Sequence, residues 1–323
     1  MNTLFVIDPL DRLDASLDTS IGLMHAAQDL GVEVWVAEAR DLEVVGGRAV
    51  ARARALTLAP SSPTTGCRWT VSDPWYDAGP VRQLALDDTP AVFMRLEPPV
   101  DLDFLAATYV LDLVDTTATA MVNAPGGLRA CSEHLLGLSF PDLVPPTVVT
   151  SNAATIQSFL DEHQRIVVKP VDGFSGRGVF LVGTADPNLA SIIETSTHGG
   201  SRAIVAQPYL AEVEAGNKRI YLLDGVAVGA SIRHPVPGDF RIVSPDGPAA
   251  VTERDREIVR RLAPTLKAHG LRCVGLDVIG DHLIEVNVTS PGALRKADAL
   301  LGTTYCADLV EHVLTHTTWK EPS

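Results

Sequence analysis

Apolar and polar positions along this chain of 323 residues alternate between strand-like and helix-like stretches. "TLFVID" at 3–8 predicts a strand, "TSIGLMHAAQDLG" at 19–31 a helix, and "VEVWVAE" at 32–38 a second strand. This alternation is typical of an α/β domain. The segment 57–80 is rich in Pro, Ser, Thr and Gly, which predicts an exposed loop with a small hairpin.

The pattern continues through the rest of the chain and divides it into three parts. The further predicted strands are 91–97, 121–125, 147–150, 166–170, 179–182, 203–210, 218–225 and 226–233, and the further helices are 102–114, 128–139, 153–163, 187–197 and 307–316. We therefore expect an N-terminal α/β domain over 1–122, a central part over 123–206 and a C-terminal part over 207–323.

The stretch "CVGLDVIGDHLIEVNVTSPG" at 273–292 carries polar residues inside an apolar pattern. Aliphatic residues alternate with Asp277 before the turn and with Glu285 and Asn287 after it, which predicts two strands. A three-residue turn at 280–282 sets Asp277 opposite Glu285, with Asn287 further along the same face. Three oxygen ligands then lie together, as hard cations require. The alternative is a solvated strand face.

A second stretch, "VVKPVDGFSGRGVFLV" at 167–182, predicts a strand ending near Lys169, a glycine-rich turn and another strand. Gly173, Gly176 and Gly178 permit unusual φ values, so that backbone N–H groups can lie over a phosphate while Lys169 supplies a charge. It is not a Walker A loop, because a strand follows the turn. The alternative is an ordinary hairpin with an exposed lysine. Together, the two stretches indicate a nucleotide site.

Composition narrows the function classes. A hydrophobic content of 46% allows a substantial core, and a net charge of -14 argues against a nucleic acid or an anionic membrane as the main partner. No stretch approaches the ~20 apolar residues of a membrane span. The four cysteines lack a Cys-x-x-Cys pair, which favours reduced thiols. We therefore expect a cytoplasmic protein.

Six sequence blocks together carry a resemblance to a known family. They are "MRLEPPVDLDFLAATYVL", "VNAP", "VVKPVDGFSGRGV", "AQPYL", "GNKR" and "GLDVIGDHLIEVNVTSP". In this order and spacing, the chain resembles the prokaryotic glutathione synthetases of the ATP-grasp superfamily over almost its whole length. The resemblance implies an α/β fold in which an N-terminal α/β (pre-ATP-grasp) domain precedes a two-subdomain ATP-grasp fold. It also implies a homo-oligomer, a tetramer in this family.

The same resemblance implies roles for the matching residues. The ATP site would consist of His134, Lys169, Gly173, Phe174, Ser175, Gly176, Arg177, Gly178, Gln207, Pro208, Tyr209, Leu210 and Asn217. Catalytic residues would be Arg219 and Arg233; Mg²⁺, with Mn²⁺ as the alternative ion, would be held by Asp277, Glu285 and Asn287; and the peptide substrate would meet Arg95, Arg241, Thr289 and Ser290. For Arg95, the alternative is an exposed surface arginine.

The implied activity is ATP-dependent ligation of γ-glutamylcysteine to glycine through an acyl phosphate. Departures from the family pattern leave alternatives. His134 stands in place of a lysine, which weakens phosphate binding or makes it sensitive to pH, and Leu96 stands in place of another lysine. The loop after Arg233 is short and rich in proline. The alternatives are a specialised paralogue for another γ-glutamyl-type dipeptide or amine, a small-molecule kinase, and a non-catalytic ATP-binding regulator.

Overall fold

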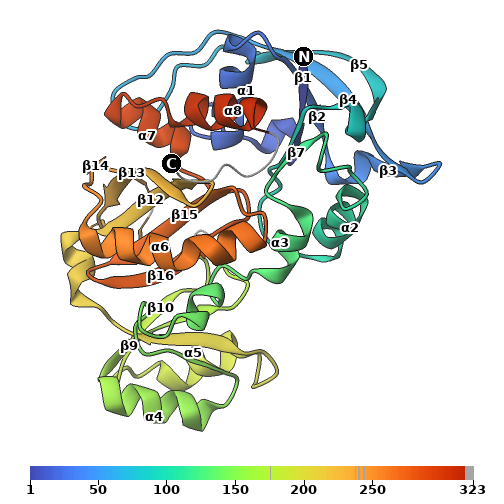
Figure 1. The fold of residues 1–323 in the computed structure, drawn as a ribbon. Coiled ribbons are helices and arrows are strands. Elements are labelled where there is room, and N and C mark those ends of the chain that lie inside the picture. Colours follow the sequence, from blue (N-terminus) through green and yellow to red (C-terminus); the bar gives the residue numbers. More distant parts are fainter. Residues whose placement is uncertain (175, 237, 239–240, 243, 317–323) are drawn as a thin grey trace.

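The structure is a computed structural model, and it describes residues 1–174, 176–236, 238, 241–242 and 244–316. Three β-sheets follow one another along the chain. The N-terminal sheet lies at one end of the molecule, the sheet formed last in the sequence lies in the middle, and a smaller sheet forms the other end (Figure 1). The mixed α/β architecture agrees with the expected fold class.

The N-terminal sheet has seven strands in the order β3-β4-β2-β1-β6-β7, with β5 paired to β4. Strands β2, β1, β6 and β7 run parallel, and the others are antiparallel additions at one edge. The strands are β1 (Asn2–Val6), β2 (Glu33–Ala37), β3 (Leu42–Val45), β4 (Arg48–Leu58), β5 (Tyr76–Ala85), β6 (Ala91–Met94) and β7 (Ala120–Val122).

Helices cover both faces of this sheet, and β1 accordingly carries apolar side chains on both of its sides. Leu4 packs in the same cluster as residues of α2 (Leu102–Leu111), whereas Phe5 packs with α1 (Thr19–Asp29) and α8 (Tyr305–Thr315). Helix α7 (Leu294–Leu301) also contacts α1. Helices from the end of the chain therefore complete the N-terminal domain (Figure 1).

The long hairpin of β4 and β5 was not predicted from the sequence. In "RAVARARALTL" half of the buried positions are small alanines, Ala49, Ala51 and Ala53, and exposed arginines interrupt the apolar pattern. Alanine has a low preference for strands, so this pattern is weaker than one of β-branched residues. The loop expected over 57–80 is shorter than predicted, because residues 57–58 belong to β4 and 76–80 to β5; between the strands lies one isolated bridge, from Pro63 to Trp69.

The smaller sheet, with its two helices, is called the lid here. It is ordered β10-β9-β11-β8 and contains β8 (Val148–Thr150), β9 (Arg165–Pro170), β10 (Phe180–Gly183) and β11 (Ile204–Pro208), with α4 (Ala153–His163) and α5 (Leu189–Ser196). Its apolar cluster is formed by these elements alone, with Leu160, Val168 and Ile193 among its members. The lid can therefore keep its own packing if it moves relative to the other sheets.

The middle sheet is ordered β14-β13-β12-β15-β16. Its elements are β12 (Asn217–Leu223), β13 (Val226–Arg233), β14 (Gly247–Pro248), β15 (Cys273–Ile279) and β16 (His282–Asn287), with α6 (Glu253–Ala268) packed on it. Its core belongs to the same apolar cluster as α2 and part of β1. The N-terminal and middle sheets therefore share one core.

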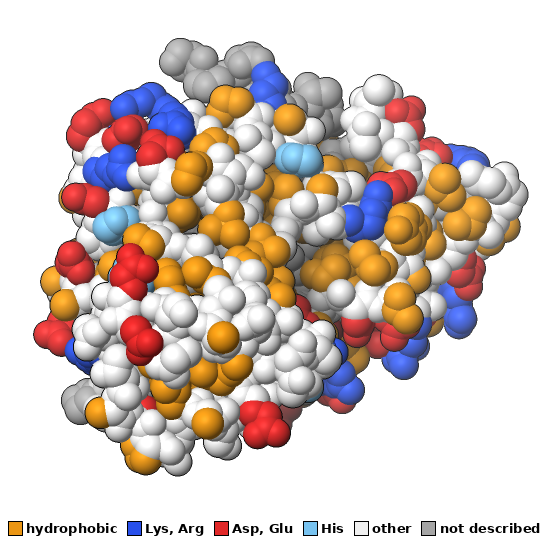
Figure 2. All heavy atoms as spheres, turned by 90° about the horizontal axis from the view of Figure 1, so that it is seen from below, with side chains coloured by type: hydrophobic (Ala, Val, Ile, Leu, Met, Phe, Trp, Pro, Cys, Tyr) orange, Lys and Arg blue, Asp and Glu red, His pale blue; other side chains and the backbone are white. Residues whose placement is uncertain are grey.

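Seen from the lid side, acidic and basic side chains are interspersed and apolar side chains gather towards the middle of the face (Figure 2). Within the described part of the chain, no helix has the length and apolar character needed to cross a membrane.

The domain boundaries expected after residues 122 and 206 stay predictions; the second of them would cut β11.

Asn123, directly after β7, links the N-terminal domain to the middle sheet. The predicted helix over 128–139 is instead α3 (Pro125–Ala130), a non-helical stretch and a short 3-10 helix, η4 (Leu136–Ser139). The Asn123 side chain is buried and donates to the carbonyl oxygens of Cys273, at 2.7 Å, and Val288, at 2.8 Å. It also accepts from the backbone N–H of Cys273 at 2.8 Å. One amide thus ties both ends of the β15–β16 hairpin to the first domain.

Replacing Asn123 with Ala is expected to lower the free energy of unfolding by about 3 kcal/mol, because three buried backbone groups lose their partner. Urea denaturation followed by circular dichroism measures this loss. Asn188→Ala is the matched control: Asn188 is exposed and makes no side-chain cap, so its loss should stay within about 0.5 kcal/mol. Equal losses in the two variants would contradict the role given to Asn123.

Candidate active site

A cavity of about 400 Å³ lies where the lid, the middle sheet and the N-terminal domain meet. Eighteen of the expected site residues line it: His134, Lys169, Gly173, Phe174, Gly176, Gln207, Pro208, Tyr209, Leu210, Asn217, Arg219, Arg233, Arg241, Asp277, Glu285, Asn287, Thr289 and Ser290. Arg95, Arg177 and Gly178 do not line it, and Ser175 lies outside the described residues. Several segments far apart in sequence therefore form one site.

The β15–β16 hairpin places two carboxylates opposite each other. Asp277 pairs with Glu285, as the sequence predicts, and Asn287 pairs with Gly275. The predicted three-residue turn is wrong, however, because Ile279 pairs with His282 and leaves a two-residue turn. A bulge next to Asp277 takes up the extra residue and restores the register.

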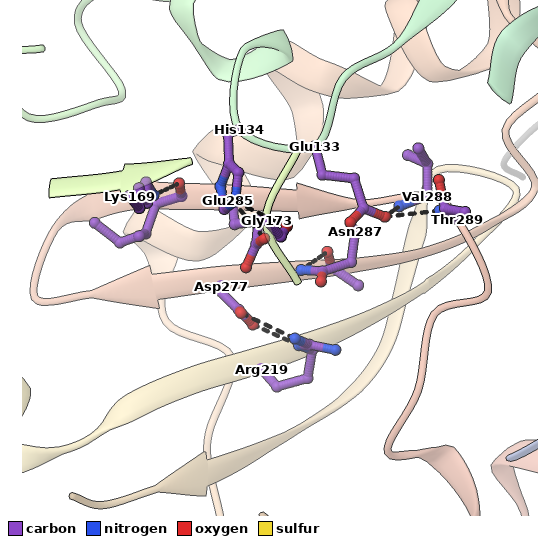
Figure 3. A network of polar contacts seen from close by, with 12 residues as sticks. Glu133, His134, Lys169, Gly173, Arg219, Asp277, Glu285, Asn287, Val288 and Thr289 are labelled. Carbon is purple, nitrogen blue, oxygen red and sulfur yellow. Dashed lines mark hydrogen bonds and ion pairs between the residues drawn. The ribbon is translucent and has the colours of Figure 1, made fainter. Parts of the chain in front are cut away.

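Asp277 is held between two buried arginines. Its carboxylate accepts from Arg219 through Nε and, at 2.9 Å, through Nη2, and it forms a 2.6 Å ion pair with Nη2 of Arg233 (Figure 3 shows Arg219). Burial by itself raises the pKa of Asp277, but the two guanidinium groups outweigh burial and hold this pKa below its ordinary value. The carboxylate is therefore ionised throughout the neutral range.

Glu285 lies in the opposite electrostatic situation. Burial, followed by the negative charge of Asp277, raises the pKa of Glu285 to about 8. Lys169 opposes this shift. A buried carboxyl group whose charged form is disfavoured in this way is suited to a cation that enters the cavity, since such a charge stabilises the ionised form.

Lys169 points from β9 of the lid towards the hairpin. Its Nζ donates to the carbonyl oxygen of Ile284 at 3.5 Å. Ile284 is the residue of β16 that lies at the bulge. The side chain is buried, and burial lowers the pKa of Lys169 although Glu285 and Asp277 oppose the change. The alternative of an exposed lysine on an ordinary hairpin is therefore wrong. One cation and two carboxylates converge across the boundary between lid and middle sheet (Figure 3).

His134 lies above Glu285 in Figure 3, with Nδ1 3.4 Å from a carboxylate oxygen of Glu285. Its Nε2 donates to the carbonyl oxygen of Gly173 at 3.2 Å. Burial, followed by the charge of Lys169, lowers the pKa of His134 to about 3. The imidazole is therefore neutral at physiological pH, and the expectation that phosphate binding would depend on pH near neutrality is wrong. The replacement of a lysine by His134 instead removes one positive charge from the site.

The neighbouring Glu133 was not singled out from the sequence. One of its carboxylate oxygens accepts from the backbone N–H groups of Val288, at 2.8 Å, and Thr289, at 2.7 Å (Figure 3). Its carbonyl oxygen accepts from Val286 at 3.0 Å. Glu133 therefore fixes the segment that leaves β16 towards Thr289. Its sequence context, Ser-Glu-His, gives no signal for this role.

The turn after β9 follows the glycine pattern expected from the sequence. Gly176 and Gly178 have φ values of 69° and 71°, in the left-handed region that favours glycine. A side chain at Gly176 would also meet Arg241 at 3.4 Å, so the turn approaches the loop that follows β13. The Arg177 guanidinium lies 5.0 Å from the centre of the Phe174 ring.

At the other end of the cavity, β11 runs into the segment that connects the lid to the middle sheet. Gln207 donates to the hydroxyl of Thr147 at 3.0 Å. The guanidinium of Arg165 lies 4.2 Å from the centre of the Tyr209 ring. The residues that line the cavity at this end are Gln207, Pro208, Tyr209 and Leu210. They form a partly apolar wall that can receive a flat aromatic base.

Arg95 is buried, so the interpretation as an exposed arginine is wrong. It donates through Nε to Ser20, at 3.2 Å, and through Nη2 to the carbonyl oxygen of Pro291, at 3.2 Å. Its own carbonyl oxygen accepts from Ser290 at 3.1 Å. Arg95 therefore holds the wall segment around Ser290 and lies behind the cavity surface.

The residues present fit a divalent cation. Within the described ranges, no group of three His, Cys, Asp or Glu side chains is close enough to form a metal cluster. The donor set is instead two carboxylates, Asp277 and Glu285, with the amide of Asn287, whose Nδ2 donates to Gly275 at 3.2 Å and leaves Oδ1 as the ligand atom. Such an oxygen set with few protein ligands is typical of Mg²⁺ bound together with phosphates.

His134→Lys is expected to lower the KM for ATP about tenfold, because it adds a positive charge next to Lys169 where the parent has a neutral ring. The change should be similar at pH 6 and pH 8, since the imidazole of the parent, with a pKa of about 3, stays neutral over this range. Steady-state kinetics at both pH values measure it. His163→Lys, on α4, is the control. A benefit confined to pH 8 would mean that His134 is protonated at pH 6.

Comparisons with known proteins extend over nearly the whole chain. The family model described as "Prokaryotic glutathione synthetase, N-terminal domain" matches residues 1–129, and "Prokaryotic glutathione synthetase, ATP-grasp domain" matches residues 133–302. The glutathione synthetase of Synechococcus elongatus is 43% identical over 306 residues, covering 94% of each chain. That of Salmonella typhimurium is 39% identical over 299 residues, covering 91% of this chain and 92% of its own.

Solved structures share the fold at low identity. The D-cycloserine synthetase DcsG superposes with a TM-score of 0.67 and 17% identity, covering 98% of this chain and 100% of its own. The ATP-grasp ligase PsnB, in a complex with its minimal precursor, Mg and ADP, has a TM-score of 0.60 and 16% identity, covering 97% of this chain and 98% of its own. These similarities concern the fold alone.

Proposed function

The chain belongs to the prokaryotic glutathione synthetase family and is an ATP-dependent C–N ligase of this type, and we propose that it joins γ-glutamylcysteine to glycine through an acyl phosphate. The observation that carries the proposal is the convergence of Asp277 and Glu285 with Lys169 and two arginines in one cavity. This set provides ligands for a metal, a contact for phosphate and positive charge for a developing anion.

In this proposal, ATP binds between the lid and the middle sheet. Lys169 and the backbone of the turn at Gly173, Phe174 and Gly176 contact the phosphates, the wall at 207–210 receives the adenine, and Asn217 lies near the ribose. Asp277, Glu285 and Asn287 would hold Mg²⁺, for which Mn²⁺ can substitute. When bound, the cation would neutralise charge on the phosphates.

The chain supplies positions and charges for two successive steps. First, the cysteinyl carboxylate of the dipeptide attacks the γ-phosphorus of ATP, ADP leaves, and Arg219 and Arg233 stabilise the negative charge on the transferring group. The amine of glycine then attacks the acyl carbon, and phosphate leaves. Closure of the lid keeps water from the acyl phosphate. Neither step needs a nucleophilic side chain.

The dipeptide would lie towards the N-terminal domain. Thr289, Ser290 and Arg241 line that part of the cavity and can contact it, while Arg95 supports the wall from behind.

The absence of a membrane-spanning helix among the described residues is compatible with a cytoplasmic location. We further propose that the protein forms a homo-oligomer, as the family resemblance suggests.

A phosphate-release assay tests the proposal. Purified protein receives ATP and Mg²⁺ with γ-glutamylcysteine and, in turn, glycine and a panel of other amines, and product masses are recorded. We expect phosphate release that requires both the dipeptide and glycine, together with the mass of the tripeptide. Release with the dipeptide alone would indicate a kinase, no release would indicate a regulator, and a preferred amine other than glycine would indicate a specialised ligase.

A further inference from the structure

Two charged side chains line the cavity on the side of the N-terminal domain and have no part in the chemistry described so far. Lys296 is in the first turn of α7, and Glu97 follows β6. Figure 1 shows α7 beside the N-terminal domain, on the side of the middle sheet that faces away from the lid. Lys296 therefore lines the cavity from α7 and Glu97 from the segment after β6, both outside the lid.

Lys296 is a half-buried cation for which the described residues provide no ion-pair partner, although the carboxylates of Asp14 and Asp18 lie near enough to favour its charge. Its Nζ donates to the hydroxyl of Ser244 at 3.3 Å, and no carboxylate of the described residues lies within ion-pair distance. Burial lowers the pKa of Lys296. The first turn of a helix also disfavours a cation, and Ala293, the N-cap residue of α7, makes no side-chain hydrogen bond to this turn. An anion at this position would relieve each of these costs.

Glu97 presents the opposite charge to the same part of the cavity. Its side chain has no ion-pair partner within the described part of the chain and is open to the cavity. Its backbone N–H donates to Asp8 at 2.9 Å, and the carboxylates of Asp18 and Asp8 add negative charge beside it, which Arg95 and Lys296 offset in part. This corner therefore favours a positively charged ligand group. One wall of the cavity thus offers a cation and the adjoining wall an anion.

Resting on the proposed function, we propose that Lys296 and Glu97 recognise the α-amino acid head of the γ-glutamyl residue, Lys296 binding its carboxylate and Glu97 its ammonium group. The head is zwitterionic and keeps both charges throughout the reaction. Glycine, the other substrate, does not keep both charges, because its amine must lose a proton before it attacks the acyl carbon. The cysteinyl end of the dipeptide must reach the phosphates, which leaves the γ-glutamyl head for the far wall.

The experiment pairs each side chain with the substrate group it contacts. Variants Lys296→Met and Glu97→Gln are compared with the parent on three dipeptides that serve as phosphoryl acceptors. They are γ-glutamylcysteine, glutarylcysteine, which lacks the α-amino group, and 4-aminobutyrylcysteine, which lacks the α-carboxylate. Lys267→Met, an exposed lysine of α6, is the control. KM values are measured for each acceptor, for glycine and for ATP, and calorimetry measures binding of γ-glutamylcysteine without ATP.

We expect Lys296→Met to raise the KM for γ-glutamylcysteine about tenfold and to weaken its binding by a similar factor, with no change for 4-aminobutyrylcysteine. Glu97→Gln should raise the KM for γ-glutamylcysteine about fivefold and leave glutarylcysteine unaffected. KM for glycine and for ATP should stay at the parental values.

Two results overturn the inference while the proposed function stands: equal losses on all three acceptors, or a rise confined to the KM for glycine. A parent protein that forms no tripeptide from γ-glutamylcysteine and glycine overturns both the inference and the proposed function. The tripeptide mass in the parental reaction therefore separates the two failures.

Discussion

Glu285→Gln is expected to give a folded protein that hydrolyses or transfers phosphate from Mg-ATP about a thousandfold more slowly than the parent. The change keeps the volume of the side chain and removes one of the two carboxylates proposed to bind the cation, a loss of about 4 kcal/mol in transition-state stabilisation. Stability without ligand should not fall, because burial already disfavours the charged form of Glu285. Phosphate release and melting temperature measure the two effects.

The control is Glu194→Gln, an exposed position on α5, which should match the parent in both assays. Asp277→Asn gives a second contrast. It should also lose turnover, but in addition it leaves two buried arginines without their carboxylate and should lower the free energy of unfolding by about 3 kcal/mol. Near-parental activity of Glu285→Gln at saturating ATP would refute the metal assignment.

Lys169→Met is expected to remove most of the thermal stabilisation that ATP gives the parent. At 100 times its dissociation constant, a ligand stabilises the folded state by about 2.7 kcal/mol, and a hundredfold loss of affinity reduces this to about 0.4 kcal/mol. The methionine keeps much of the apolar length of the buried lysine, so the melting temperature without nucleotide should change little. A titration with ATP, followed by differential scanning fluorimetry, measures the difference.

Lys267→Met serves as the control for the loss of a lysine, because Lys267 is exposed at the end of α6, outside the cavity. It should give the same ATP-dependent shift as the parent. If Lys169→Met also responds as the parent does across the titration, Lys169 does not contact the phosphates and the nucleotide must bind elsewhere in the cavity.

The sequence alone predicted the central pairing of the site but not how it is achieved. Alternation of apolar and acidic residues set Asp277 opposite Glu285, because the period of a strand decides which side chains share a face. It could not reveal the two-residue turn and the bulge, since a longer turn gives the same pairing. The bulge matters because it brings the carbonyl oxygen of Ile284 towards Lys169.

Residues whose roles depend on distant parts of the chain were not found in the sequence. Glu133 binds backbone N–H groups more than 150 residues away, and nothing in its neighbours indicates those partners. Lys296 resembles any helical lysine until α7 is placed against the cavity. The strand β4 was missed because small alanines give a weak pattern. Local periodicity therefore predicted elements and pairings, and tertiary packing decided the rest.

The cover that α7 and α8 give to the N-terminal domain has a consequence for synthesis in the cell. The apolar side of α1 packs against α8, which is made nearly 300 residues later. At roughly 5–20 residues per second, the ribosome needs about 15–60 s to supply this cover. During this interval the nascent first domain exposes an apolar surface, so its yield should depend on chaperone capacity and on translation speed.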